Sequence, residues 1–458
     1  MRIVLLVSIA SLLVLFTTGN ALADATAESF LHQPASVQQT AFAYDDYAYM
    51  LQDESTTEPP DAAPSEAPEP VVGETQEKSL SVDVTDELGS CASSCGQCAT
   101  RRSGCGHWTL PQSEALACRG IDVGGWLSGG LYSNAHGASN NGPLGFNTLG
   151  NGFTFNQLWV YAERATDTGG YGTDIGFRFD YLFGVDGPDD QAFGDGGWDF
   201  GWDSSSDYGS AIPQLYVELA YNDLKVKLGH FHTIIGWEVV PAPENFFYTH
   251  AYTMYYGEPF THTGILASWA ANDRVTVHGG WTMGWDSGFE NLNEGSTFLG
   301  GVSTELTDNA TLTWAFTAGR FGDGSFGADG DVYMNSLVFE LALTDRLTYI
   351  LQHDLGDNSD LGAGDNEWYG INQYLQFELN DCWATGLRFE WFRDDDGTRV
   401  GDAGSYYEVT AGLNYRPCEH LVVRPEIRGD WFDGVAKPFN NGHSDEQFSG
   451  GFDVIWSF

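Results

Sequence analysis

From Arg119 to Phe458 the chain alternates apolar and polar residues with a period of two. Between Asp174 and Phe183, one face of the pattern carries Ile175, Phe177, Phe179, Tyr181 and Phe183, while Arg178 and Asp180 fall on the other. Because successive side chains of a β-strand point to opposite faces, this alternation predicts strands with one apolar and one wet side.

Sixteen such runs follow one another, and most have 9–13 residues. Strands of soluble proteins are commonly about 5–6 residues long, whereas a tilted strand that crosses a bilayer needs about 9–11. The runs are 119–131, 153–163, 171–183, 212–222, 224–235, 263–271, 274–285, 297–307, 310–320, 333–344, 346–355, 367–379, 382–392, 405–416, 420–431 and 446–458.

Short turns and long loops alternate between these runs. Asn222-Asp223 and Thr344-Asp345 are short turns, while residues 184–211 and 236–262 form long loops. Outer-membrane barrels have short periplasmic turns and longer outer loops, which a soluble sandwich has no reason to sort in this way. We therefore predict an all-β fold, a transmembrane antiparallel up-and-down β-barrel of about 16 strands, with 14 or 18 strands as neighbouring possibilities. A soluble secreted β-protein is the alternative.

The first 118 residues differ from the rest. Residues 1–23 have a basic start, an apolar run and a small-x-small cleavage site, which together predict a signal peptide. Residues 24–118 are acidic, Pro/Ala-rich and contain five cysteines, so we expect a flexible periplasmic extension in which disulfides are favoured over a zinc site. Residues 119–458 are then the barrel.

The charge is strongly acidic, with 64 Asp and Glu against 19 Lys and Arg. A nucleic-acid partner is excluded, because a phosphate backbone needs a basic face. Aspartates gather in one long loop without the spacing of an EF-hand. Loose Ca²⁺ binding or simple solvated charge would explain them, and we expect no dedicated metal site or cofactor. These residues are Asp186, Asp189, Asp190, Asp195, Asp199 and Asp203.

The segment GWEVVPAPENFFYTHAY (236–252), followed by PFTHTG (259–264), resembles the family of OmpL-like outer-membrane β-barrel porins. This resemblance implies a passive channel for small polar solutes in the bacterial outer membrane, with outer-membrane lipid around it. It implies no catalytic residues. Sixteen-stranded porins are often trimers, so a homo-trimer is one possibility. The C-terminal Phe458 resembles the signal that the barrel assembly machinery recognises.

In sixteen-stranded porins the third long loop commonly folds inward, so we expect loop 236–262 to narrow the pore. Glu238, Glu244 and Asn245 would present oxygens from the loop. The facing wall would carry Arg388, Arg424 and Arg428, with Glu390 and Glu426 interleaved. Opposed charges would set a transverse field that sorts solutes. Two alternatives stay open: the loop caps the mouth, or the charges only satisfy one another.

Cys382 and Cys418 lie at neighbouring short turns, and we predict a disulfide between them if the turns close the gap. His230 and His232 share a face with Val226 and Leu228, which places them on the lipid side rather than in a metal site. The sequence has no G-x-S-x-G or H-E-x-x-H motif, so we do not expect an enzyme. A surface adhesin or receptor barrel that presents its long acidic loops is the alternative function.

Overall fold

The structure, a computed structural model, describes residues 114–193, 198–199, 207–322, 330–360 and 364–458. The predicted signal peptide (1–23) lies outside the described residues, as does nearly all of the predicted extension (24–118). Asp195 and Asp203 also lie outside them. None of the helices in the described ranges is long and apolar enough to cross a membrane.

Sixteen long strands form the wall, and each end lies within five residues of the end predicted from the alternation. The predicted number of strands is confirmed. The strands are β1 (Asp122–Asn134), β2 (Gly152–Arg164), β3 (Thr173–Gly184), β5 (Leu215–Tyr221), β6 (Leu224–His232), β7 (Thr261–Asn272), β8 (Val275–Thr282), β9 (Ser296–Thr307), β10 (Ala310–Arg320), β11 (Asp331–Thr344), β12 (Leu347–Asp360), β13 (Gly364–Asn380), β14 (Trp383–Asp394), β15 (Gly404–Cys418), β16 (Leu421–Gly434) and β17 (Glu446–Ser457).

The remaining elements are short. Strand β4 (Gly209–Ala211) has three residues and pairs with the end of β3. The helical turns are α3 (Glu114–Ala117), η2 (Gly145–Asn147), α4 (Gly187–Asp190), η3 (Ala242–Glu244) and the π-helical turn η4 (Thr253–Gly257).

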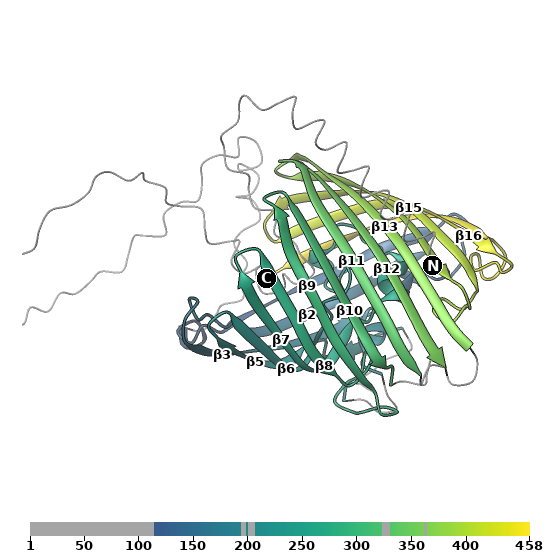
Figure 1. The fold of residues 1–458 in the computed structure, drawn as a ribbon. Helices are drawn as coiled ribbons and strands as arrows, with labels where there is room; N and C mark the ends of the chain where they lie inside the picture. The colour runs from purple at the N-terminus through teal and green to yellow at the C-terminus, as the bar shows by residue number, and fades with distance from the viewer. Residues whose placement is uncertain (1–113, 194–197, 200–206, 323–329, 361–363) are drawn as a thin grey trace, which may run out of the picture. The chain divides into compact units, whose positions relative to one another are not determined.

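The wall strands close into a barrel (Figure 1). Each one pairs antiparallel with its neighbours in chain order, and β1 pairs with both β2 and β17. At the seam, the Phe458 N–H donates to the Gly125 carbonyl (2.8 Å) and the Gly125 N–H donates to the Phe458 carbonyl (3.1 Å). Closure matters because it leaves no unpaired strand edge in a hydrocarbon environment.

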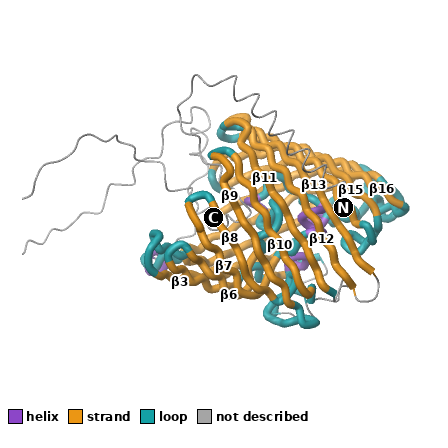
Figure 2. The backbone as a smooth tube through the Cα atoms, in the orientation of Figure 1, coloured by secondary structure: helices purple, strands orange, loops and turns teal. Residues whose placement is uncertain are grey.

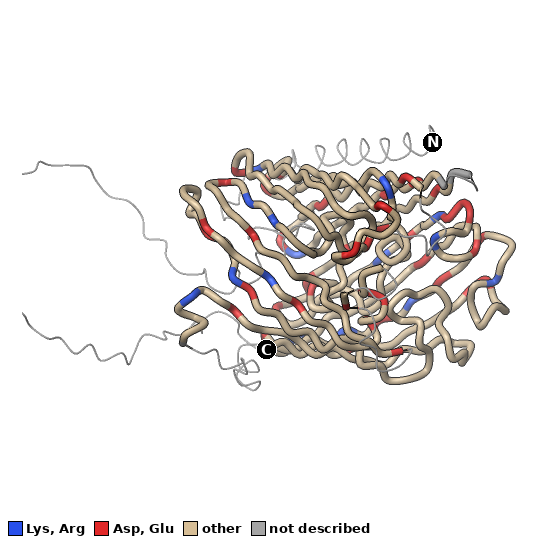
Figure 3. The backbone as a smooth tube through the Cα atoms, turned by 90° about the horizontal axis from the view of Figure 1, so that it is seen from below, with Lys and Arg blue, Asp and Glu red and all other residues tan. Residues whose placement is uncertain are grey.

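The two faces of the wall differ as the alternation predicts. On β3, Ile175 and Phe179 are exposed, whereas Arg178 and Asp180 are buried on the opposite, inner face. Figure 3 shows acidic and basic positions interleaved along the strands of the barrel. An apolar outer belt around a polar interior is the arrangement of a barrel that crosses a membrane.

Short turns use residues that tolerate the necessary backbone angles. Asn222, in the turn between β5 and β6, has a φ of 52°, which asparagine adopts more readily than most residues. Its side-chain oxygen also accepts a hydrogen bond from the Gly172 N–H (2.9 Å). This contact joins the β5–β6 turn to the turn that precedes β3.

Candidate functional site: a loop folded into the barrel

Residues 233–260, the connection between β6 and β7, turn into the barrel, and we call them the inner loop. The loop closes at its base, where the Thr233 N–H donates to the Phe260 carbonyl (2.9 Å). It forms hydrogen bonds with inward-facing side chains of strands far apart in the chain, among them Gln157 on β2, Gln352 on β12 and Glu390 on β14. Figure 2 shows short helical segments (purple) among the strands.

Two wall carboxylates hold the middle of the inner loop through a repeated Tyr-Thr pair. Glu426 on β16 accepts from the N–H groups of Tyr248 (2.8 Å) and Thr249 (3.2 Å) and from the Thr249 hydroxyl (2.6 Å). Glu390 on β14 accepts from the N–H groups of Tyr252 (2.7 Å) and Thr253 (2.6 Å) and from the Thr253 hydroxyl (2.6 Å).

Each carboxylate therefore receives three charge-assisted hydrogen bonds from one Tyr-Thr pair, and such bonds are roughly twice as strong as neutral ones. The two tyrosines are four residues apart in the sequence, as are the two threonines, and the two glutamates lie on β14 and β16.

Three buried arginines complete the anchoring from the same wall by donating to carbonyl groups of the inner loop. Arg388 donates to the Thr249 carbonyl (2.7 Å) and forms an ion pair with Glu238 of the loop (2.7 Å). Arg424 donates to the carbonyls of Ala242 (2.8 Å) and Asn245 (2.6 Å), and Arg428 donates to that of His250 (2.7 Å).

Acidic side chains on the wall balance these guanidinium groups. Asp453 on β17 pairs with Arg424 (2.6 Å), Asp430 on β16 pairs with Arg428 (2.8 Å), and Glu408 on β15 pairs with Arg388. The arginines are at most 3% exposed. Each of the three guanidinium groups is thus paired with at least one carboxylate of the wall.

The base of the inner loop is held by a second set of polar groups, which the sequence did not indicate. The Gln352 side chain on β12 accepts from the Trp237 N–H (3.2 Å) and donates to the carboxyl group of Glu258 and to Asp354 (3.0 Å). Gln352 thus ties both ends of the loop to β12. Glu258 is fully buried beside Asp354, and burial, with the charge of Asp354, raises the pKa of Glu258 well above its usual range.

Inward-facing glycines make room for the inner loop on strands β13–β16, which we call the anchoring wall. A Cβ atom added to Gly386 on β14 would lie 2.5 Å from the ring of Phe246, and one added to Gly370 on β13 would lie 2.4 Å from the Thr253 hydroxyl. A larger side chain at either position would displace the loop.

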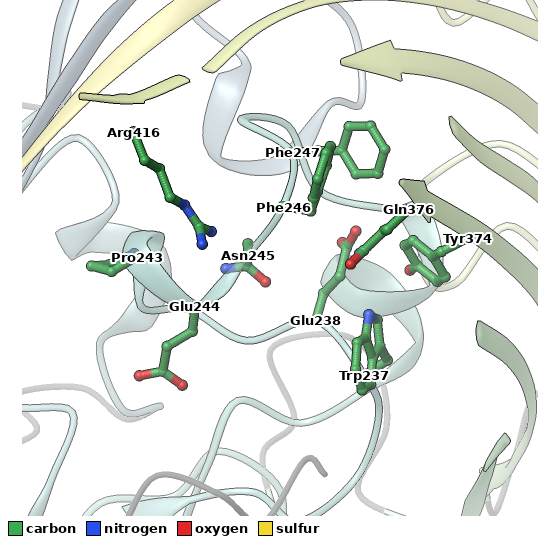
Figure 4. A pocket seen from close by; sticks show the side chains of 10 residues that line it. All are labelled: Trp237, Glu238, Pro243, Glu244, Asn245, Phe246, Phe247, Tyr374, Gln376 and Arg416. Carbon is green, nitrogen blue, oxygen red and sulfur yellow. The ribbon is translucent and has the colours of Figure 1, made fainter. Parts of the chain in front are cut away.

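Glu244 differs from the other acids of the inner loop. Its carboxylate accepts no hydrogen bond from any described residue, whereas Glu238 and Glu258 are both bonded. Burial raises the pKa of Glu244 to about 8; Arg178 on β3 opposes this shift, and Asp180 adds to it. In Figure 4 its side chain points away from the neighbouring loop residues.

Glu244 also lines a cavity of about 40 Å³ between the inner loop and the ends of β13 and β15 (Figure 4). The cavity has charged groups from both sides, with Glu244 and Glu238 on the loop and Arg416 on β15. Trp237, Phe246, Phe247 and Tyr374 supply aromatic walls. A cavity of this size holds one or a few water molecules.

Asn245, which we predicted to face the pore, braces the loop itself. Its side chain accepts from the Val239 N–H (3.0 Å) and donates to the carbonyls of Val239 (2.5 Å) and Pro241 (3.1 Å). The structure therefore brings all seven predicted residues (Glu238, Glu244, Asn245, Arg388, Arg424, Glu426 and Arg428) to the inner loop or its anchoring wall. They make different contacts there.

The predicted disulfide between Cys382 and Cys418 is wrong. Cys418 is a buried free thiol, whereas Cys382 is disulfide-bonded, so the two do not pair with each other. The register of β14 and β15 explains why the two cysteines do not face each other. Cys382 lies beside Arg416, whose N–H donates to the Cys382 carbonyl (2.8 Å). Cys418 lies two residues further along β15, opposite Leu421.

The other predicted features are the histidines of β6 and the aspartates that follow β3, of which Asp189 is hydrogen-bonded to Tyr255 of the inner loop. His230 pairs with the outward-facing Leu215, as expected for the lipid side, yet it is fully buried against the rings of Trp198 and Phe289. Asp186 accepts hydrogen bonds from Asn156 (3.0 Å) and Gln157 (2.8 Å). Among the residues the structure describes, no group of three or more His, Cys, Asp or Glu side chains could hold a metal ion. Loose Ca²⁺ binding by the acidic loops stays a prediction.

A closed barrel of sixteen antiparallel strands with an apolar outer face is the architecture of porins, and solved porins share it. The anion-selective porin from Comamonas acidovorans superposes with a TM-score of 0.53 and 11% identity, over 74% of this chain and 99% of that one. The outer membrane channel DcaP of Acinetobacter baumannii superposes with a TM-score of 0.51 and 10% identity, over 74% and 97%.

The chain belongs to the family described as "Putative beta-barrel porin-2, OmpL-like", whose family model matches residues 120–458. The resemblance seen in the sequence is thereby confirmed. No curated protein sequence matches the chain.

Proposed function

We propose that this barrel is a passive channel for small polar solutes in the bacterial outer membrane, and that the inner loop forms its narrowest part. The observation that carries the proposal is the anchoring of the loop inside the barrel by Glu390, Glu426 and three buried arginines. A loop that only covered the mouth would not need buried charges at this depth. Membership of a porin family supports the same function, and we assign the barrel no catalysis.

We further propose that the channel prefers cations above about pH 8, where Glu244 is ionised, and that Glu244 is the main reason. The carboxylates of Glu238 and Glu258 are occupied by Arg388 and Gln352, whereas Glu244 accepts no hydrogen bond from a described residue. A carboxylate available to passing ions attracts cations, as charged rings do in other channels. The Comamonas acidovorans porin is anion-selective, so the fold alone does not decide this preference.

Purified barrel reconstituted into a planar bilayer under an asymmetric salt gradient tests both parts. We expect discrete, open conductance steps and, above about pH 8, a reversal potential of cation sign. A reversal potential of anion sign would contradict the assigned preference. The complete absence of conductance from folded, inserted protein would contradict the channel itself.

A further inference from the structure

Cys382, the residue before β14, is disulfide-bonded, and neither of the other two cysteines in the described ranges is its partner. Cys118 and Cys418 both carry free thiols. The sequence has seven cysteines, so the three described ones leave four candidates. All four lie in the predicted extension, outside the described residues, at Cys91, Cys95, Cys98 and Cys105.

We infer that Cys382 forms its disulfide with one of these four cysteines, and that the bond fastens the N-terminal extension to the end of the barrel where β14 begins. The attachment point lies beside the inner loop. The Arg416 N–H donates to the Cys382 carbonyl (2.8 Å), and the Arg416 side chain lines the same cavity as Glu244. The inference concerns the attachment of the extension and is independent of the proposed channel activity.

The topology of the wall brings the start of β1 and the start of β14 to the same end of the barrel. From β1 the wall continues through β17, β16 and β15 to β14, and each of these four steps is antiparallel. An even number of antiparallel steps gives two strands that run in the same direction. Neighbouring strands lie about 4.8 Å apart, which separates β1 from β14 by roughly 20 Å around the wall.

The extension is long enough to span this distance. The described chain starts at Glu114, shortly before β1, and the nearest candidate, Cys105, precedes Glu114 by nine residues. An extended chain covers about 3.3 Å per residue, so nine residues reach about 30 Å. The three other candidates lie further back in the chain and have a longer reach. Each of the four can therefore meet Cys382.

Charge and burial around Cys382 fit such a bond. Glu378 and Asp381 are exposed on the barrel side, whereas Arg101 and Arg102 stand between the last two candidate cysteines in the sequence. Opposite charges favour the approach of these two segments over other pairings. Cys382 itself is only 3% exposed although the residues on either side of it are exposed, as expected for a sulfur atom enclosed by its bonded partner.

The formation of this bond needs an oxidant, which the predicted export of the chain supplies. The bond joins two Sγ atoms and removes two protons and two electrons from the two thiols. In the oxidising compartment outside the cytoplasm, a protein disulfide accepts them by thiol–disulfide exchange and is reduced to two thiols. The extension then has two covalent connections to the barrel, one through the backbone at β1 and one through sulfur at β14.

Peptide mapping of the full mature chain, purified from outer membranes with its free thiols blocked, identifies the partner. Trypsin places Cys382 in peptide 347–388 and Cys418 in peptide 400–428, because it does not cleave before Pro417 or Pro425. The four candidates fall in peptides 79–101 and 103–119. We expect 347–388 to be linked to one of these two peptides until reductant is added. A link to 400–428 or to another protein, or blocking of Cys382 before reduction, would overturn the inference.

A cut in the backbone tests whether the bond holds the extension to its own barrel. A recognition site for a specific protease, inserted between Arg119 and Gly120, allows the extension to be separated from β1. After cleavage of the folded barrel, the two fragments should migrate together as one chain in a non-reducing denaturing gel and separate when reductant is added.

Two variants complete this test. In Cys382→Ser the fragments should separate without reductant, whereas in the control Cys418→Ser they should stay together. Three results would overturn the inference: wild-type fragments that separate without reductant, fragments that stay linked in Cys382→Ser, or migration at the size of two chains. The first and third results come from the wild type, so the inference stays testable even where a variant folds poorly.

Discussion

Two stretches of the inner wall are built from different residues. On β14 and β16 the inner face carries Arg388, Glu390, Arg424, Glu426 and Arg428, all buried. On β9 and β10 it carries mostly small or uncharged groups, among them Thr297, Ser303, Thr313, Ala315 and Thr317, and a charged residue, Glu305, only near the turn. Hydroxyl groups there bond to one another, as Ser303 does to Thr313 (3.0 Å).

This difference in side chains matches the places where the inner loop makes its hydrogen bonds. Among the described residues, the loop forms many hydrogen bonds with β14 and β16 and none with β9 or β10. Buried charge costs free energy unless each group is paired and hydrogen-bonded, so charges inside this barrel are placed where the backbone of the loop satisfies them. The inner face of β9 and β10, which we call the hydroxyl wall, needs no such partner because its hydroxyl groups bond to one another. The charged wall therefore serves to anchor the loop, and replacing one polar side chain on each wall tests this.

The largest expected effect comes from Arg388→Met, because the change removes the ion-pair partner of the buried Glu238 and leaves Glu408 with its longer ion pair to Arg428 (3.5 Å). We expect the free energy of unfolding to fall by about 3–5 kcal/mol. Urea unfolding in lipid vesicles measures it. The matched variant on the hydroxyl wall, Thr313→Ala, loses one neutral hydrogen bond and should cost about 1 kcal/mol. Equal costs at the two positions would remove the distinction between the walls.

A smaller effect is expected from Gly386→Leu, which fills the space of Phe246 without touching a charge. Overpacking of this kind typically costs about 1–3 kcal/mol. We expect the displaced inner loop to raise current noise and to change single-channel conductance in planar bilayers. Gly429→Leu on β16 is the control, since a Cβ at Gly429 meets no atom within 4 Å. Identical conductance traces for the two variants would argue against contact between the loop and β14.

Glu244 gives a pH-dependent prediction. Its pKa of about 8 means that the carboxyl group is neutral well below pH 8 and charged above it. Cation preference should therefore increase as the pH rises from 6 to 9, and reversal potentials at each pH measure it. In Glu244→Gln this rise should disappear. A wild-type reversal potential that stays constant over this range would show that Glu244 does not face the ion path.

The smallest effect concerns the cysteines. In unfolded but unreduced protein, a thiol reagent should label Cys418 and leave Cys382 unlabelled until reductant is added. Peptide-level mass spectrometry separates the two sites. If both cysteines stayed unlabelled until reductant was added, the result would support the predicted disulfide between Cys382 and Cys418.

The strands could be predicted because the period of two determines which face each residue occupies. The inward turn of the loop between β6 and β7 was also anticipated, together with the charged residues around it. The hydrogen-bond and ion-pair partners of these side chains could not be predicted, because alternation gives the face that a side chain occupies and not the atom that it contacts. Arg388 and Arg424 were placed correctly on the inner face, yet their bonds to carbonyls of the loop depend on the three-dimensional path of the loop.

The Tyr-Thr repeat, the cysteine pairing and Gln352 could not be interpreted correctly from the sequence alone. The repeat Tyr248-Thr249 and Tyr252-Thr253 matches the two glutamates on β14 and β16, but a repeat of two dipeptides has no meaning without the fold. The disulfide was predicted wrongly because its geometry depends on a two-residue register difference at the strand ends. Gln352 gave no signal, since a lone glutamine on an inner face is ordinary.

The central claim is that the backbone of the inner loop is bonded to Glu390 and Glu426 inside the barrel. Amide hydrogen exchange of the folded barrel, followed by mass spectrometry, tests it most directly, because a buried and bonded N–H exchanges slowly. We predict that the N–H groups of Tyr248, Thr249, Tyr252 and Thr253 exchange as slowly as those of β14, and much faster in Glu390→Gln/Glu426→Gln. Exchange of the wild-type loop at the rate of the exposed segment 440–445 would contradict the account.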